Sequence, residues 1–422
     1  MAKPKLALIP ASQGTKLYSV LPADGVGDFN FSRNTGATRI NKDGLIETVA
    51  VGKSRLNYPL IDGKVVGCPS HLLEPERTNL VTYSEDFSNS SWNKLPYVAI
   101  TPNTTISPIG FLDADTCTFT TFGTNTQLYK VISTSGSTQT ISIFIKYLSG
   151  SGTNVRLSIS SSSTKGVDLT FSNNGETLSA VKGASVNDFS IEKHKNNWFR
   201  VSISVAQSAS STEFNLFKTN GSETDSYAIW GAQLESNQSY QTSYIPTTNS
   251  AVTRVAETAN GAGDASTFNS SEGVLMAEIS ALADDGTNRV ITLNDGSTSN
   301  RVQVYFNTSN QINVGVSPSG SGQPDISYTV DIKSFLKVAF KYKTNDFALW
   351  VNGIKVGENL TGIVPTGLNA LNFDNTGGTL PFYGNVKQIQ YFDSALNDSD
   401  LEKITSWTSF TDLANGQLYS IK

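Results

Sequence analysis

The sequence predicts an all-β protein in which two consecutive antiparallel β-sandwiches follow an extended N-terminal arm. Three observations support this prediction. The chain has 422 residues, which suits two or three domains. Apolar and polar residues alternate over two long stretches, as in strands with one buried face. Charged residues are only 16% of the chain, so Ser, Thr, Asn, Gln and Gly must cover much of its surface, and these residues favour strands and turns.

Residues 1–70 are predicted to form an extended arm with short hairpins. The turn signals Asp43-Gly44 and Asp62-Gly63 interrupt short apolar pairs in this segment. Such a segment buries little apolar surface by itself. We therefore expect it to dock on another body and to anchor the protein.

The first sandwich is expected over residues 71–250. In "WFRVSISVA" the alternation predicts one core face that carries Phe199, Val201, Ile203 and Val205. In "YAIWGAQL" it predicts a core face that carries Ala228, Trp230, Ala232 and Leu234.

Two segments are expected to connect the parts. "LLEPERTNLVTYSEDFSNSSW" should join the arm to the first sandwich, with Glu74 or Glu76 paired to Arg77 and these charges fixing the angle. Residues 251–270 are small and polar, and they are predicted to be a linker.

The second sandwich is expected over residues 271–422. Its strongest local signal is "DFALWVNGIKV", where Asn352-Gly353 favours a type I′ hairpin turn. Near the end, Ser399 and Glu402 match a capping box, which predicts a short C-terminal helix.

The composition argues against several classes of partner. The formal net charge is −5 and no long basic run occurs, so we expect no nucleic-acid partner. No apolar run is long enough to span a bilayer, and the start lacks the apolar core of a secretory signal, so neither membrane insertion nor export is expected.

We expect no catalytic centre. The chain has two histidines, His71 and His194, and neither has a neighbour at the spacing of a metal site or a catalytic triad. Four acids could serve a glycosidase, namely Glu74, Glu76, Glu85 and Asp86. A glycosidase pair must face across a cleft, and proximity in sequence does not supply that, so ion pairing and strand-edge roles are preferred.

Four residues are candidates for carbohydrate binding, namely Trp198, Arg200, Tyr129 and Trp350. Aromatic rings can stack on the apolar faces of sugars. Because Phe199 belongs to the core, Trp198 should lie on the polar face beside Arg200. A partly exposed Trp there suits either a sugar platform or a contact between domains or subunits, and both interpretations remain open.

The stretch "YKTNDFALWVNGIKV…YGNVKQIQYFDSALNDSDLEKI" resembles the end of a concanavalin A-like, laminin G-type sandwich. The matching positions are Asp393, Ala395, Leu396, Asn397, Asp400 and Leu401. The resemblance covers the last third of the chain and implies this fold for the second sandwich. It implies little about function, because the family includes lectins, adhesion modules and glycanases.

The middle region resembles a jelly-roll carbohydrate-binding module, with "SEDFSNSSW" as its opening strand and "YAIWGAQLE" as its closing strand. The resemblance implies glycan binding. The family often holds a structural calcium, which would make Glu85 a ligand, but "AIWG" stands where the closing strand needs acids. Asp295, in "NDG", is a second weak calcium candidate that a simple turn explains better. We expect no other cofactor.

Three strings together, "SRNTGATRIN", "CPSHLLEPERTNLVTYSEDFSNSSW" and "WGAQLESNQSYQTSYIPTTNSAVTRVAE", resemble a block found in virion proteins of tailed bacteriophages. Such proteins are head-fibre, tail-fibre or spike components. The resemblance covers residues 30–258 and implies a homotrimeric structural protein at the virion surface, assembled in the host cytoplasm. It would bind other virion proteins through the arm and would bind cell-surface glycans through its sandwiches. Two alternatives are a virion-associated polysaccharide depolymerase and a non-binding capsid decoration protein.

Overall fold

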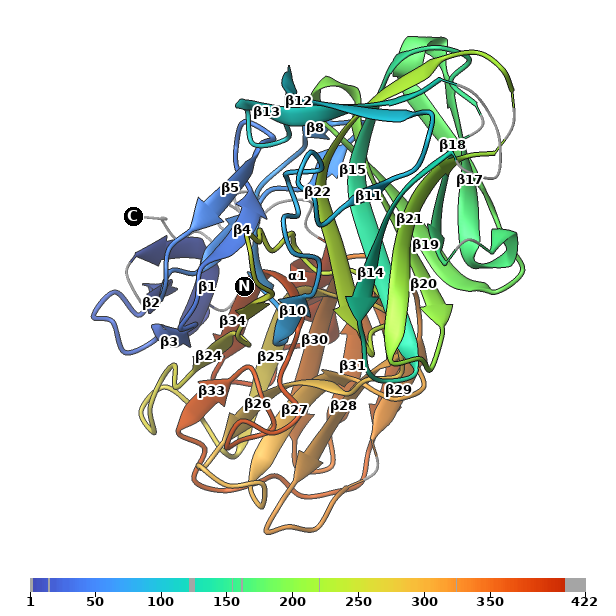
Figure 1. The fold of residues 1–422 in the computed structure, drawn as a ribbon. Coiled ribbons are helices and arrows are strands. Elements are labelled where there is room, and N and C mark those ends of the chain that lie inside the picture. Colours follow the sequence, from blue (N-terminus) through green and yellow to red (C-terminus); the bar gives the residue numbers. More distant parts are fainter. Residues whose placement is uncertain are drawn as a thin grey trace.

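A computed structural model confirms that the protein is all-β. It describes residues 3–13, 16–120, 126–153, 155–160, 162–219, 221–323 and 325–406. Antiparallel strands form two sandwiches, the first at the upper right of Figure 1 and the second below it. Within the described residues the chain has one α-helix, α1 (Asp398–Ser406), and none long and apolar enough to cross a membrane.

The first sandwich consists of two six-stranded sheets. The sheet that we call the junction sheet has the order β12 (Val98–Ile106), β13 (Leu112–Phe119), β22 (Asp225–Ser236), β15 (Thr138–Ser149), β20 (Trp198–Ala206) and β19 (Val186–His194). The far sheet has the order β11 (Asn93–Lys94), β14 (Gln127–Ser133), β21 (Ser211–Lys218), β16 (Val155–Ile159), β17 (Gly166–Ser172) and β18 (Thr177–Lys182).

The two sheets enclose one apolar core. Strand β20 contributes the predicted face to it, namely Phe199, Val201, Ile203 and Val205. Each of these side chains is at most 3% exposed. Burying a side chain of this size contributes roughly 1.5–3 kcal/mol, so the alternation that identified the strand also identifies its main stabilising contacts.

Strand β22 reverses its facing at Gly231. Before this glycine Trp230 points away from the core of the first sandwich, whereas after it Ala232 and Leu234 point into that core. Gly231 has a φ of 64°, and the pairing with β15 shifts register there. A bulge inserts one extra residue and so inverts the alternation. The prediction that Trp230 shares a face with Leu234 is therefore wrong.

The second sandwich packs a five-stranded sheet on a larger one of 11 strands. The smaller sheet has the order β29 (Ile326–Thr329), β28 (Gln311–Ser317), β27 (Arg301–Phe306), β26 (Arg289–Asn294) and β33 (Ala370–Asn372). The larger sheet runs β24 (Thr258–Asn260), β3 (Phe29–Ser32), β2 (Lys16–Leu21), β1 (Leu6–Gln13), β34 (Gly384–Phe392), β25 (Glu272–Ala281), β30 (Leu336–Lys343), β31 (Phe347–Val351) and β32 (Ile354–Asn359). Strand β9 (Ser70–Leu73) also pairs with β34, and β6 (Arg55–Asn57) pairs with β9.

Much of the predicted arm belongs to this larger sheet. Strand β1 pairs with β34, which places Leu6 opposite Tyr391 and Leu8 opposite Ile389. Leu6 and Leu8 are fully buried in the core of the second sandwich. Short strands gain stability when they extend an existing sheet, so this segment is not a separate extended body. The prediction of an arm apart from the second sandwich is wrong for these strands.

The rest of the N-terminal segment forms two small hairpins that lie by the first sandwich (Figure 1). One consists of β4 (Ala37–Ile40) and β5 (Ile46–Val49), and the other of β7 (Leu60–Ile61) and β8 (Lys64–Val65). The backbone N–H of Ile46 donates to the carbonyl of Pro108 at 3.0 Å, which ties the first hairpin to the turn between β12 and β13.

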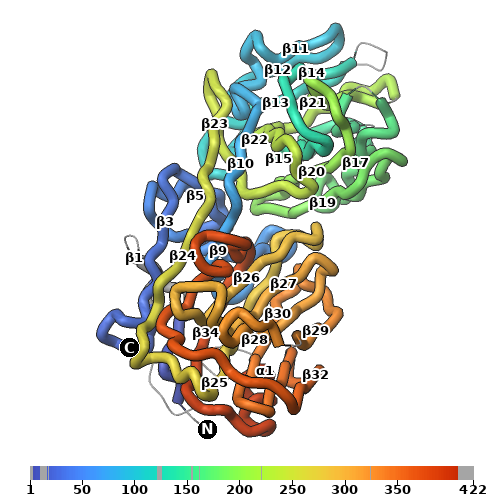
Figure 2. The backbone as a smooth tube through the Cα atoms, turned by 90° about the horizontal axis from the view of Figure 1, so that it is seen from below, coloured from blue at the N-terminus to red at the C-terminus, as the bar shows by residue number. Residues whose placement is uncertain are grey.

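The first sandwich is inserted into the second. The chain leaves the second sandwich through β10 (Arg77–Asn79) and returns through β23 (Val252–Arg254), and these two strands pair with each other, as Figure 2 shows. The predicted linker 251–270 therefore contains the paired strands β23 and β24 instead of unpaired chain.

Helix α1 covers the outer side of the larger sheet. Leu401 and Ile404 pack there with Trp350, which is 6% exposed. The side-chain oxygen of Asn397 accepts the N–H of Asp400 at 2.9 Å. The helix cap is therefore Asn397 and not the predicted Ser399. The hairpin turn Asn352-Gly353 is confirmed, because both residues have positive φ, as a type I′ turn requires.

Candidate functional site at the junction of the sandwiches

A buried network of five charges holds the joint between the sandwiches. Glu257 pairs with Arg33 at 2.7 Å and with the Nε of Arg55 at 2.9 Å. Glu74 pairs with Arg55 at 2.8 Å and with Arg254 at 2.9 Å. None of these side chains is more than 4% exposed. Such charges are tolerated in the interior because each is paired.

The network ties together three separate stretches of chain. Arg33 and Arg55 come from the N-terminal segment, Glu74 from the joint, and Arg254 and Glu257 from the returning connection. Burial by itself raises the pKa of the Glu74 carboxyl, but Arg254 and Arg55 outweigh burial and hold that pKa well below its usual range. Glu74 thus lies at the joint between the two sandwiches.

The predicted partner of Glu74 is wrong. Arg77 instead lies over the ring of Tyr240, 5.4 Å from its centroid, and its Nε is 4.0 Å from Glu235. Glu76 is exposed. Local spacing favoured a neighbour in sequence, whereas the fold supplies arginines from segments far away along the chain.

The outward face of the junction sheet is covered, so Trp198 is not a platform. Trp198 is fully buried, and its Nε1 donates to the carbonyl of Ile106 at 3.0 Å. It belongs to an apolar cluster with Trp230, Tyr244 and Ile46, which come from three segments. The prediction of a partly exposed Trp198 is wrong, and the residue makes a contact between parts of the chain.

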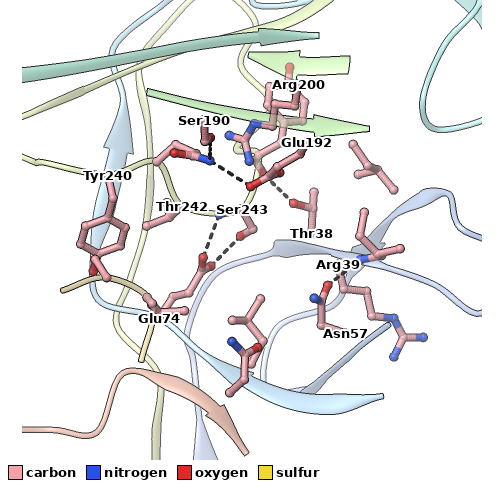
Figure 3. A pocket seen from close by; sticks show the side chains of 18 of the residues that line it. Thr38, Arg39, Asn57, Glu74, Ser190, Glu192, Arg200, Tyr240, Thr242 and Ser243 are labelled. Carbon is pink, nitrogen blue, oxygen red and sulfur yellow. Dashed lines mark hydrogen bonds between the residues drawn. The ribbon is translucent and has the colours of Figure 1, made fainter. Parts of the chain in front are cut away.

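A polar cavity of about 420 Å³ lies where the first sandwich, the N-terminal segment and the second sandwich meet (Figure 3). The first sandwich and its closing segment line it with Asp188, Ser190, Glu192, His194, Arg200 and Gln241. The N-terminal segment contributes Thr38, Arg39 and Asn57, and the second sandwich contributes Asp284 and Lys333.

Hydrogen bonds among these residues fix one wall of the cavity. The amide Nε2 of Gln241 donates to Ser190 at 2.8 Å and to Glu192 at 3.0 Å, and its Oε1 accepts from Ser202 at 2.7 Å. On the opposite side in Figure 3, Ser243 donates to Glu74 through its N–H at 2.8 Å and its hydroxyl at 2.6 Å. The cavity is thus continuous with the charge network of the joint.

Arg200 reaches this wall with its Nε donor unused among the described residues. It is 5% exposed, donates from Nη2 to Ser142 at 3.1 Å, and lies 5.4 Å from the centroid of the Phe144 ring. Its Nε has no hydrogen-bond partner among the described residues. His194, also 5% exposed, has no partner for either ring nitrogen within the described part of the chain.

The other carbohydrate-binding candidates lie elsewhere. Tyr129 is half-buried on β14 of the far sheet, opposite Asn93. Trp350 packs under α1 in the second sandwich. The structure therefore brings Arg200 alone of the four to the cavity. The sequence reasoning missed Ser190 and Glu192 and considered His194 only for a metal site or a catalytic triad. These three residues alternate on one face of β19, and this polar alternation was the signal that could have found them.

The two calcium candidates have other partners. Glu85 accepts the hydroxyl of Tyr244 at 2.9 Å. Asp295 accepts from the N–H of Ser297 at 2.9 Å and from Asn300 at 2.9 Å, which is the geometry of a turn. Over the residues that the structure describes, no group of three or more His, Cys, Asp and Glu is placed to hold a metal ion.

A second hollow, of about 590 Å³, is lined by four carboxylates, Glu85, Asp86, Asp113 and Asp115. Burial raises the pKa of Glu85, and the nearby Asp113 carboxylate adds to this rise. Burial likewise raises the pKa of Asp113 and of Asp115. Of the four predicted glycosidase acids, only Glu85 and Asp86 lie here.

No family model and no curated protein matches the chain. Among solved structures, the family 40 carbohydrate-binding module of a Ruminococcus gnavus sialidase is 16% identical, with a TM-score of 0.30, over 34% of this chain and 87% of that one. Domain 4 of an arabinanase from Geobacillus stearothermophilus is 9% identical, with a TM-score of 0.29, over 40% of this chain and 83% of that one. Mouse laminin α1 domains LG4-5 are 10% identical, with a TM-score of 0.22, over 66% of this chain and 92% of that one. Because these TM-scores are low, the likenesses carry no argument about function.

Proposed function

We propose that this protein is a structural component of the virion surface of a tailed bacteriophage, as a head fibre or a tail fibre or spike. In this role it displays glycan-binding β-sandwiches for adhesion to the host. It acts as a homotrimer attached to other virion proteins, assembled in the host cytoplasm. Strands β1 to β3 are part of the second sandwich, so we propose the attachment surface on that sandwich instead of on a free arm.

The observation that carries the proposal is the charge network of the joint. Each of the three strings that resemble the bacteriophage block contributes to this network. The first string supplies Arg33, the second Glu74, and the third Arg254 and Glu257. These strings lie far apart in sequence, yet their charged residues form one buried cluster. The resemblance thus includes the residues that fix the first sandwich relative to the second. Several such copies on one particle would convert weak sugar contacts into firm attachment.

Two measurements test the proposal. Antibodies to the purified protein should decorate intact particles in immunogold electron microscopy, and the labelled position separates capsid from tail. The purified full-length protein should be retained on host cell-surface polysaccharide. Failure to label any particle contradicts the virion assignment. Labelling without retention on any host glycan would leave a non-binding decoration protein.

One observation favours a second candidate, a virion-associated polysaccharide depolymerase. A glycosidase acid needs a raised pKa, and burial gives Glu85 that property beside three other carboxylates. Incubation with host polysaccharide would then release reducing ends, and Glu85→Gln would abolish the release. Asp168→Asn, on the far sheet, is the matched control. No release by the unchanged protein eliminates this candidate.

A further inference from the structure

We propose that the cavity between the sandwiches is a composite binding site for an uncharged sugar residue with neighbouring free hydroxyl groups. This inference rests on the proposed function, because it names the ligand class for glycan binding. Its site is built by the first sandwich, the N-terminal segment and the second sandwich together. Neither sandwich contains it alone.

The first step is that the cavity wall holds polar groups that the described residues leave without partners. Arg200 and His194 are each 5% exposed, and Arg200 Nε and both ring nitrogens of His194 have no hydrogen-bond partner among the described residues. The Oε2 of Glu192 lies 3.8 Å from Nε2 of His194, which is within ion-pair range but longer than a hydrogen bond. Buried polar groups nearly always find partners, so a bound molecule is the natural source of them here.

The second step is the sign of the charge that the cavity offers. Lys333 pairs with Asp284 at 3.5 Å, and Arg39 pairs with Glu47 at 3.2 Å, so each of these two cations already has a carboxylate partner. Glu74 is neutralised within the joint. One cation then remains, Arg200, against two carboxylates, Asp188 and Glu192. A ligand with its own carboxylate would meet net negative charge, which disfavours it.

The third step is the pattern of donors and acceptors. Arg200 can only donate, whereas Asp188 and Glu192 can only accept when ionised. A hydroxyl group both donates and accepts, so two adjacent hydroxyls of a sugar ring can satisfy Arg200 and Glu192 at once. Figure 3 shows these two side chains close together on the same wall. Gln241 keeps Glu192 in place through its 3.0 Å hydrogen bond.

The fourth step is the opposite wall. Leu282 and Ala283 of the second sandwich line the cavity beside the Asp284–Lys333 pair. Apolar groups of this kind suit the C–H face of a sugar, and the ion pair can hydrogen-bond to its edge. The site therefore depends on the fixed relation of the two sandwiches that the joint provides.

The test measures binding of the full-length protein to paired oligosaccharides that differ by one residue, either a neutral hexose or the matching uronic acid. We expect the neutral member to bind and the acidic member to bind more weakly. Glu192→Gln and Arg200→Gln should each weaken binding of the neutral member by roughly tenfold, the effect of losing one hydrogen bond to a charged group. Lys333→Ala should weaken it through the opposite wall.

Arg156→Gln is the matched control, because Arg156 pairs with Asp168 on the far sheet and should leave binding unchanged. Glu192 is exposed enough for its variant to fold even if the Arg200 variant does not. Preference for the acidic member, or neutral binding that is insensitive to both Glu192→Gln and Lys333→Ala, overturns this inference and leaves the proposed function standing. Absence of binding to every oligosaccharide and to host polysaccharide overturns this inference together with the glycan-binding part of the proposed function, whereas immunogold labelling tests the virion part separately.

Discussion

Glu257 accepts hydrogen bonds from three different residues at the joint. Its carboxylate accepts from Arg33, from Arg55 and from the backbone N–H of Glu74 at 2.9 Å. It is therefore the residue through which the N-terminal segment, the joint and the returning connection meet. A carboxylate with such partners cannot be replaced without leaving buried positive charge unpaired.

We predict that Glu257→Gln lowers the free energy of unfolding by about 3–5 kcal/mol, because two buried arginines lose their shared counter-charge. Chemical denaturation of the full-length protein measures this change. Glu402→Gln, on the exposed side of α1, is the control and should change little. Equal stability of the two variants would show that the network contributes no net stability.

His71 makes the stability depend on pH. Burial lowers the pKa of His71 from 6.5 to about 4. Between these two values the unfolded chain binds a proton that the folded chain does not, so stability decreases as the pH falls through this window. The shift corresponds to about 3 kcal/mol at its full extent.

We predict that His71→Gln makes this dependence shallower. Glutamine does not titrate, and it can still bond to Ser54, whose Oγ lies 2.9 Å from Nδ1 of His71. The measurement is the free energy of unfolding in urea at several pH values between 6.5 and 4. Parallel curves for the variant and the unchanged protein would contradict the assignment.

At the scale of elements, the bulge in β22 decides which side chains each face receives. Because of the bulge, Leu234 packs in the core of the first sandwich, whereas Trp230 of the same strand contacts the N-terminal hairpin. A Cβ atom at Gly231 would lie 2.9 Å from a ring carbon of Phe144, and the residue has φ of 64°. Both the space and the backbone therefore require glycine.

We predict that Gly231→Ala destabilises the protein by about 1–3 kcal/mol, the range for a strained backbone conformation, with a further cost from the contact with Phe144. Gly377→Ala is the matched control. Gly377 has a similar φ of 61° but open space around its Cβ position. Thermal unfolding of both variants separates backbone strain from contact, and equal losses would show that the contact with Phe144 has no effect.

The elements show how far sequence reasoning reaches. The alternation identified β20 and its core face correctly, because that face depends only on the strand itself. It missed the burial of Trp198, because the residues that cover it, Ile46 and Tyr244, come from segments far away in sequence. The candidate site was missed for the same reason, since its lining comes from distant segments. Of its residues, Arg200 alone was named beforehand as a binding candidate, whereas Glu74 and His194 were named for other roles.

On the scale of the whole molecule, the N-terminal strands complete the second sandwich. Strand β1 pairs along β34 in the middle of the larger sheet, and Leu17 and Phe29 are fully buried in the same core. The second sandwich is therefore built from both ends of the described chain. Its stability depends on residues that precede the first sandwich.

We predict that deletion of residues 1–32 lowers the solubility of the protein and shifts its thermal unfolding to lower temperature. The deletion removes buried leucines and phenylalanines and leaves part of β34 without a neighbouring strand, and an unpaired strand of this kind promotes aggregation. Light scattering and calorimetry measure the two effects. An unchanged, soluble and cooperatively unfolding protein would contradict the arrangement of the larger sheet.

The insertion of the first sandwich through β10 and β23 has a mechanical consequence. Both strands run from one body to the other, side by side. A force that pulls the bodies apart is thus shared by two covalent chains that act in parallel. The load runs along both strands, and the hydrogen bonds between them lie across its direction, so pulling the two sandwiches apart does not separate β10 from β23.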